Sequence, residues 1–153
     1  MMRLCSDVLD ALKGKTLVTA ESCTGGGIGA ALTAVPGSSE VYKGGVICYT
    51  NWVKNQILYV DQTLLDTHGA VSAPVAEAMA IGARAALQAD IAVSVTGLAG
   101  PGTDDFGNAV GTVYIGYSDE TVTQVKRFSF SGDRDSVRKQ AVSAALELIL
   151  QMQ

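Results

Sequence analysis

Histidine and cysteine are scarce in this sequence. One histidine, His68, and three cysteines occur among 153 residues, and the cysteines lie far apart at Cys5, Cys23 and Cys48. An odd number of cysteines at wide spacing is not a disulfide framework, so we expect reduced thiols and a cytoplasmic location. With one imidazole, placed in a predicted exposed loop, no metal cluster is indicated. We therefore expect no metal and no organic cofactor, and a nucleophile would need a base other than histidine.

Runs of basic residues and long apolar stretches are absent as well. The 11 lysine and arginine residues are scattered and the net charge is −4, which argues against a nucleic-acid partner. No apolar stretch approaches the ~20 residues of a membrane span, and the N-terminus has no signal-peptide pattern. Aromatic residues make up only 6%, whereas 17 glycines favour close packing of helices on a sheet. Length and composition indicate one globular domain over residues 1–153.

Strand and helix patterns alternate along the chain. The predicted strands cover residues 16–20, 46–50, 91–96, 112–117 and 122–130. The predicted helices cover residues 4–13, 25–32, 52–59, 73–87 and 133–152, with a further helix beginning near residue 63. This order predicts an α/β fold, a three-layer α/β/α sandwich around a mostly parallel five-stranded sheet. The short turn between the last two strands gives the sheet an antiparallel edge.

The segments that follow the predicted parallel strands carry hydroxyl, amide and amine groups. In open α/β sheets, ligands bind beyond the carboxyl ends of the strands. Three segments should therefore meet around one pocket: Glu21 to Thr24, Thr50 to Lys54, and Thr96 to Pro101.

A serine, a tyrosine and a lysine lie within one short segment, at Ser39, Tyr49 and Lys54. A lysine can replace histidine as the base that activates a serine, provided that its surroundings lower its pKa to roughly 7–8. Tyr49, in the predicted strand between them, would then relay or position a proton. The structural alternative is that Ser39 turns the chain after Pro36-Gly37, Tyr49 packs, and Lys54 is a solvated helix residue.

Ser22 and Cys23 are competing nucleophiles at the start of a glycine-rich segment. Glu21 precedes Ser22, and the segment through Gly27 leaves a strand and enters a helix. Backbone N–H groups at a helix N-terminus bind anions, but no lysine follows the glycines, so this is not a P-loop. Both anion binding and helix capping by Ser22 or Thr24 fit the pattern.

Arg134 and Arg138 lie four residues apart, on one face of the last predicted helix. The first turn of a helix disfavours a cation because the helix macrodipole is positive there. Their position indicates either an anionic ligand, such as a phosphate, or pairing with Asp133 or Asp135.

Seven segments, in order along nearly the whole chain, carry a family resemblance. They are Ala20–Gly26, Pro36–Ser39, Gly44–Lys54, Gly69–Ser72, Val95–Gly102, Val110–Val113 and Gly132–Arg134. Together they resemble the CinA C-terminal domain family, which is also described as nicotinamide-nucleotide amidase.

That resemblance implies hydrolysis of the carboxamide of nicotinamide mononucleotide (NMN) to nicotinic acid mononucleotide and ammonia, without a cofactor. It implies Ser39 as the nucleophile, Lys54 as its base, and Tyr49 as an aid to proton transfer. Thr96 would position the substrate or stabilise the oxyanion, and Arg134 would meet the ligand, with Arg138 as the alternative. The other implied pocket residues are Ser22, Thr24, Gly25, Gly26, Asn51 and Gly97.

The resemblance leaves one alternative function, and one loop of this sequence differs from the family pattern. The family carries a competence or DNA-damage label, so the alternative is a non-catalytic nucleotide- or protein-binding module. The loop from Thr103 to Ala109 also differs from the family, which often has further glycines and a Lys-Pro pair there, and its acidic residues would weaken binding of a phosphorylated substrate. The expected partners are NMN and further copies of the chain, since a symmetric dimer is the commonest assembly.

Overall fold

The computed structural model describes residues 1–153 as five strands, six α-helices and one short 3₁₀ helix. The strands are β1 (Leu17–Glu21), β2 (Tyr42–Ile47), β3 (Ile91–Gly97), β4 (Thr112–Ser118) and β5 (Thr123–Ser129). The α-helices are α1 (Met2–Ala11), α2 (Gly27–Thr33), α3 (Asn51–Leu58), α4 (Gln62–His68), α5 (Ala73–Ala86) and α6 (Arg134–Gln151). The 3₁₀ helix, η1 (Ser38–Glu40), directly precedes β2.

The strands form one mixed sheet in the order β2-β1-β3-β4-β5. β1 lies at the centre of the parallel part, with β2 on one side and β3 on the other. β4 runs antiparallel to both β3 and β5, so the last two strands form an antiparallel edge, as predicted.

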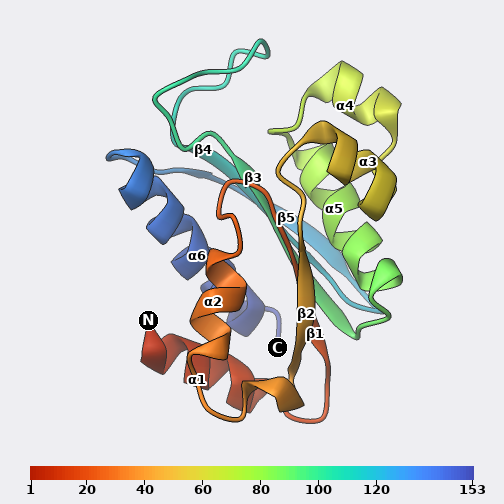
Figure 1. Cartoon of the computed structure of the whole chain (residues 1–153), viewed down its shortest axis with the longest axis vertical. Coiled ribbons are helices and arrows are strands. Elements are labelled where there is room, and N and C mark those ends of the chain that lie inside the picture. Colours follow the sequence, from red (N-terminus) through yellow and green to blue (C-terminus); the bar gives the residue numbers. More distant parts are fainter.

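Helices cover both faces of the sheet. Figure 1 shows α1, α2 and α6 on one face and α3, α4 and α5 on the other. Alternate residues of β3 enter different cores: Val93 and Val95 pack in the cluster beneath α1, α2 and α6, whereas Ala92 packs in the cluster beneath α3, α4 and α5. This alternation is the normal consequence of strand geometry. The predicted three-layer α/β/α sandwich is confirmed.

The second strand starts and ends earlier than predicted. The pattern placed it at residues 46–50, but β2 spans Tyr42–Ile47 and therefore includes Gly44 and Gly45. Glycine has low strand propensity, so a pair of glycines in the sequence predicts a turn and not a strand. Here Gly45 is required because a Cβ at this position would collide with the Thr19 hydroxyl on neighbouring β1. Tyr49 consequently lies in the connection between β2 and α3, not in a strand.

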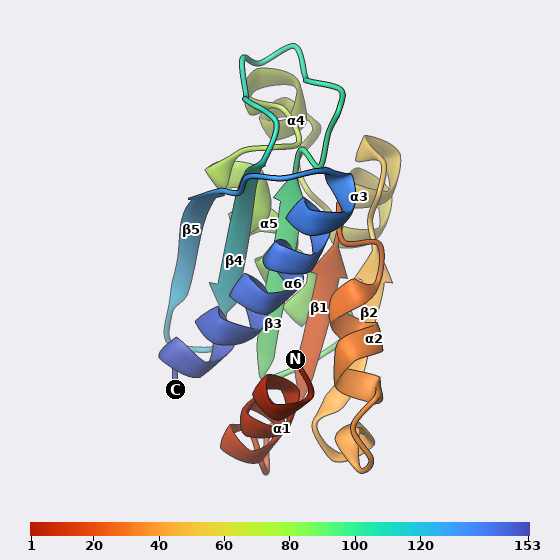
Figure 2. The same ribbon diagram turned by 90° about the vertical axis from the view of Figure 1, so that its left-hand side faces the viewer.

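The carboxyl ends of β1, β2 and β3 lie at one end of the sheet, together with the long β3–β4 loop (Figure 2). β1 leads there to Ser22, β2 leads to α3, and β3 leads to the loop at residues 98–111. None of the helices combines the length and the apolar character that a membrane span requires.

Candidate active site

A cavity of about 510 Å³ lies beyond the carboxyl ends of β1 and β3. Its volume falls within the range of roughly 300–1,000 Å³ that is typical of small-molecule sites. All three predicted segments contribute to its walls, and the β3–β4 loop supplies the rest. The lining residues are Ser22, Cys23, Tyr49, Asn51, Lys54, Ala70, Val71, residues 96–100, residues 102–106 and Arg134.

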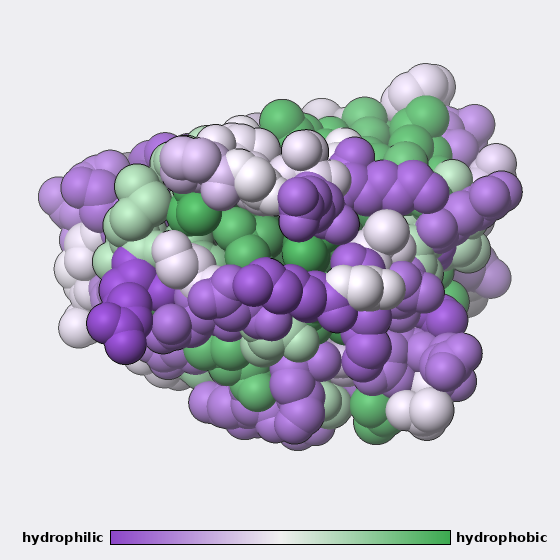
Figure 3. Space-filling view, turned by 90° about the horizontal axis from the view of Figure 1, so that it is seen from below, coloured by the Kyte–Doolittle hydropathy of each residue, from purple (hydrophilic) through white to green (hydrophobic).

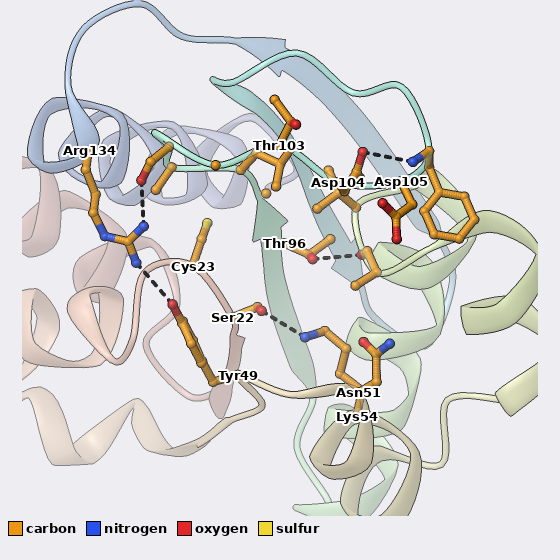
Figure 4. Close-up of a pocket in the computed structure, with 18 residues that line it drawn as sticks. Ser22, Cys23, Tyr49, Asn51, Lys54, Thr96, Thr103, Asp104, Asp105 and Arg134 are labelled. Carbon is orange, nitrogen blue, oxygen red and sulfur yellow. Dashed lines mark hydrogen bonds between the residues drawn. The ribbon is translucent and has the colours of Figure 1, made fainter.

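Lys54 and Ser22 form a buried hydrogen-bonded pair in this cavity. The Lys54 Nζ atom donates to Ser22 Oγ at 2.8 Å and to the carbonyl oxygen of Cys48 at 2.7 Å. Figure 4 shows the two side chains pointing toward one another across the cavity floor. Lys54 is 1% exposed and Ser22 is 8% exposed. Ser22 follows β1 directly, and its own N–H donates to Val95 of β3, which fixes its backbone.

No carboxylate lies within ion-pair distance of the Lys54 amine. Burial lowers the pKa of Lys54, although the neighbouring thiols of Cys48 and Cys23 act in the opposite direction. A buried amine without a counter-ion favours its neutral form. A neutral amine in contact with a serine hydroxyl can accept the hydroxyl proton, which is the property a general base needs.

Cys23 also lines the cavity, but its thiol is poorly suited to act as a nucleophile. Burial raises the pKa of Cys23 to about 11, and the nearby Lys54, Arg138 and Arg134 offset this only in part. Near neutral pH the thiol therefore stays protonated, whereas the reactive form of cysteine is the thiolate. Of the two adjacent candidates, the geometry favours Ser22.

The structure does not bring Ser39 and Lys54, the pair that the resemblance implied, into contact. Ser39 lies in η1, which precedes β2, whereas Lys54 lies in α3, which follows it. The strand of six residues between them separates the two by the length of the sheet. Ser39 is exposed and is not among the residues that line the cavity. η1 belongs to the lower end of the molecule in Figure 1, which Figure 3 shows from below as a mixed surface of hydrophilic and hydrophobic residues.

The glycine-rich segment after Ser22 is not an open anion site. The buried carboxylate of Glu21 accepts hydrogen bonds from the backbone N–H groups of Ile28 and Gly29, in the first turn of α2. The hydroxyls of Thr24 and Thr19 also donate to it. Neither Ser22 nor Thr24 caps α2; Glu21 takes that role. Sequence reasoning missed this function because it requires a side chain six residues before the helix to fold back on it.

Three predicted pocket residues therefore have a structural position instead. Thr24, Gly25 and Gly26 do not line the cavity. Thr24 directs its hydroxyl to Glu21, and both glycines adopt positive φ angles, 57° and 100°, that turn the chain from β1 into α2. Left-handed backbone of this kind costs glycine little and other residues more.

Arg138 also lies outside the cavity, and the prediction that it contacts the ligand is not supported. Its Nε atom donates to the carbonyl oxygen of Cys23 at 3.0 Å, and its NH2 group donates to that of Thr24 at 3.2 Å. These bonds tie the segment after Ser22 to α6. The alternative that paired Arg138 with Asp133 or Asp135 is not observed either, since Asp135 pairs with Lys139.

Arg134 and Tyr49 stand together on one wall of the cavity (Figure 4). The Arg134 guanidinium donates to the Tyr49 hydroxyl at 3.0 Å and to the carbonyl oxygen of Gly100 at 2.8 Å. Its remaining N–H groups are available to a ligand, since a guanidinium has five donors. Arg134 thus combines a fixed position with a free positive charge at the cavity wall.

The other predicted pocket residues divide by their contacts. Thr96 and Gly97 line the cavity at the end of β3, and Asn51 lines it from the start of α3. The Thr96 hydroxyl donates its proton to the carbonyl oxygen of Ala70 at 2.8 Å, so that proton is not free for an oxyanion. The Asn51 side chain makes no hydrogen bond within the protein and is open to a ligand.

His68 lies away from the cavity, exposed at the end of α4, which agrees with its predicted non-catalytic character. No group of three or more histidine, cysteine or acidic side chains is gathered where it could hold a metal ion.

Comparisons with known proteins agree with this fold. The CinA C-terminal domain family matches residues 2–153. A crystal structure of a competence-damaged protein (CinA) superfamily protein from Escherichia coli superposes with a TM-score of 0.97 at 34% identity, over 99% of this chain and 90% of that one. A competence/damage inducible protein from Agrobacterium tumefaciens gives a TM-score of 0.95 at 35% identity, over 99% and 94% of the two chains. This chain belongs to the CinA C-terminal domain family.

Curated relatives are of two kinds. A CinA-like protein of Geobacter sp. (strain M21) is 52% identical over 125 residues, which cover 82% of this chain and 30% of the relative. The chain thus spans about a third of the length of such relatives. The nicotinamide-nucleotide amidohydrolase PncC of Escherichia coli (strain K12) is 44% identical over 99% of this chain and 93% of its own length.

Proposed function

We propose that this chain is an amidohydrolase that converts NMN to nicotinic acid mononucleotide and ammonia, with Ser22 as the nucleophile and Lys54 as its base. The observation that carries this proposal is the buried 2.8 Å contact between the Lys54 amine and the Ser22 hydroxyl, with no carboxylate within ion-pair distance of the amine. The name of the E. coli relative, at 44% identity over nearly the whole of both chains, supports the choice of substrate.

Acylation needs only these two side chains. Neutral Lys54 accepts the proton of Ser22 as Oγ attacks the carboxamide carbon, which forms a tetrahedral intermediate. The resulting ammonium gives the proton to the departing nitrogen, the C–N bond breaks, and ammonia leaves an acyl ester on Ser22. In the second half a water attacks the ester carbon while Lys54 takes its proton. Lys54 returns that proton to Ser22 Oγ as the acid is released.

The surrounding groups have supporting roles in this proposal. The N–H of Cys23 has no backbone acceptor, so it is free to donate to the oxyanion, a role often taken by the residue after a nucleophile. Tyr49, held by Arg134, lines the cavity, where its hydroxyl can assist proton transfer by positioning the carboxamide nitrogen for the proton from Lys54. Thr96 acts by fixing the Ala70 segment of the cavity wall. Arg134 offers its free N–H groups to the substrate phosphate.

Ammonia release from NMN tests this mechanism directly. We expect turnover by the wild type and its loss in Ser22→Ala and in Lys54→Met, by a factor of roughly 10²–10⁴ for loss of the base. Ser39→Ala is the matched control, because it removes a serine hydroxyl far from Lys54, and it should retain full activity. Loss of turnover in Ser39→Ala with retention in Ser22→Ala would refute the assignment.

Two further outcomes bear on the substrate and on the rival function. Absence of turnover by a folded wild type would refute the amidohydrolase and leave the non-catalytic binding module. A complete loss of turnover after treatment with EDTA would refute a mechanism that needs no metal. We further propose a cytoplasmic homodimer, which light scattering of the purified protein and cell fractionation would check.

A further inference from the structure

The β3–β4 loop places two adjacent carboxylates at the cavity, and they differ in what holds them. Asp104 accepts hydrogen bonds from the backbone N–H groups of Phe106 and Asn108 and from the Asn108 side chain. Burial alone would raise the pKa of Asp104, but the hydrogen bonds from Asn108 and Phe106 outweigh it and lower the pKa. Asp104 is therefore an ionised anchor for the loop.

Asp105 has no such structural role. Its carboxylate accepts no hydrogen bond and forms no ion pair within the protein, although the residue lines the cavity. Because Asp104 fixes the turn, Asp105 is directed to the cavity side of the loop, as Figure 4 shows. A free carboxylate presented by an ordered turn is available to a ligand.

An aromatic ring stands next to this carboxylate. Phe106 lines the same wall and is 48% exposed, even though its ring lies against Gly69, where an added Cβ would approach the ring to 2.5 Å. Asn108 ties the loop to the segment after α4 through the carbonyl oxygen of Val71. The ring and the carboxylate are thus held together on one side of the cavity.

Charge is distributed unevenly around the cavity. Arg134 lies on one side of Ser22 and Lys54, whereas Asp104 and Asp105 lie on the other (Figure 4). A ligand with a positively charged ring at one end and a negatively charged group at the other fits this charge distribution. Its reacting group would then lie between the two ends, next to Ser22 and Lys54. The opposite orientation would set the tail beside two carboxylates and the ring beside a guanidinium.

We propose that Asp105 and Phe106 form a subsite for the positively charged pyridinium ring of the substrate, with Asp105 as the specificity-determining residue. This inference rests on the proposed function and deepens it. The carboxylate attracts the ring charge and the Phe106 face offers a cation–π contact, so the site selects N1-substituted, cationic carboxamides over neutral ones. The acidic loop then contributes to recognition of the ring and does not simply repel the phosphate.

Binding measurements on an inactive variant can isolate the contribution of the ring charge from that of the rest of the ligand. In a Ser22→Ala background, the dissociation constants of NMN and of reduced NMN, whose dihydropyridine ring is neutral, are measured by calorimetry. We expect Asp105→Asn to weaken NMN binding about tenfold and to leave reduced NMN unchanged. Phe106→Leu, which keeps bulk over Gly69, should also weaken NMN more than reduced NMN. Glu77→Gln, an exposed acid on α5 outside the cavity, is the control and should change neither.

Two results would overturn the subsite. Unchanged NMN affinity in Asp105→Asn would show that the carboxylate does not contact the ligand. Equal weakening of both ligands would show that Asp105 binds the ribose hydroxyls and not the ring. Ammonia release by the wild type, measured separately, tests the proposed function itself, so an active enzyme with an unaffected Asp105→Asn variant refutes only the subsite.

Discussion

Replacement of Lys54 by methionine distinguishes a catalytic amine from a structural one. Methionine is apolar and of similar length, so it fills the same space without donating a hydrogen bond. The carbonyl oxygen of Cys48 then loses its donor, which costs about 1–3 kcal/mol. Against this, the protein no longer buries an amine without a counter-ion, and desolvation of a buried charge costs several kcal/mol. We expect a variant that is as stable as the wild type or more stable near pH 7, yet inactive.

The pH dependence of stability has a definite sign. Burial lowers the pKa of Lys54 in the folded state below its value of 10.5 in the unfolded chain. Between the two values the unfolded state binds more protons, so the stability of the wild type rises with pH across this range and levels off above 10.5. The stability of Lys54→Met lacks this contribution. The difference between wild type and variant should therefore shift in favour of the wild type as pH rises.

Urea unfolding from pH 6 to pH 10, with ammonia release measured on the same samples, tests both expectations. Lys43→Met is the matched control: its Nζ atom also donates to a backbone carbonyl, that of Gln88, but its side chain is exposed. Lys43→Met should keep full activity and lose little stability, because its side chain is exposed. A Lys54→Met variant that is destabilised by 3 kcal/mol or more at every pH would refute the reasoning and give Lys54 a structural role.

The other predictions concern Glu21 and two arginines near Ser22, and Asp119 in the turn between β4 and β5. Glu21→Gln should destabilise the fold by about 2–3 kcal/mol in urea unfolding, because an amide cannot satisfy all four donors that the carboxylate binds. Arg138→Ala should lower kcat about tenfold with little change in KM, because it loosens the segment after Ser22, the proposed nucleophile. Arg134→Ala should chiefly raise the KM for NMN. The reverse pattern would contradict both assignments. Burial opposes ionisation of Asp119, but hydrogen bonds hold its pKa at about 2, against 3.8 when unfolded. This stabilisation, about 1 kcal/mol after screening, is present above pH 4 and lost as pH falls toward 2, so Asp119→Asn should remove it in acid unfolding.

Most of the fold could be predicted from the sequence because periodicity and turn residues agree along the chain. The apolar run at residues 91–96 became the buried strand β3, and the short turn after β4 produced the antiparallel edge. The failure lay in β2, where local propensity and packing disagree. Two glycines are poor strand formers, but the contact of Gly45 with Thr19 leaves no room for a side chain.

The composition of the site was more predictable than its pairing. The rule that ligands bind beyond the carboxyl ends of strands gave the correct three segments. The sequence placed Lys54 in the pocket but offered Ser22 only as a competing nucleophile, because proximity in sequence and the resemblance favoured Ser39. A six-residue strand lies between Ser39 and Lys54, and the residue that meets Lys54, Ser22, directly follows the neighbouring strand β1, 32 positions away. Only the parallel pairing of β1 and β2 brings Ser22 and Lys54 to the same end of the sheet.

α3, which carries Lys54, approaches α5 closely. An added Cβ at Gly82 of α5 would collide with the carbonyl oxygen of Leu58, the last residue of α3. A glycine in mid-helix destabilises the helix by about 1 kcal/mol relative to alanine. The close contact between the two helices, which only glycine permits, compensates for this cost. Lys54 is buried on α3, and with no carboxylate within ion-pair distance its amine tends toward the neutral form. α3 thus holds Lys54 against the carboxyl end of the sheet, and the order of the strands decides which serine it contacts.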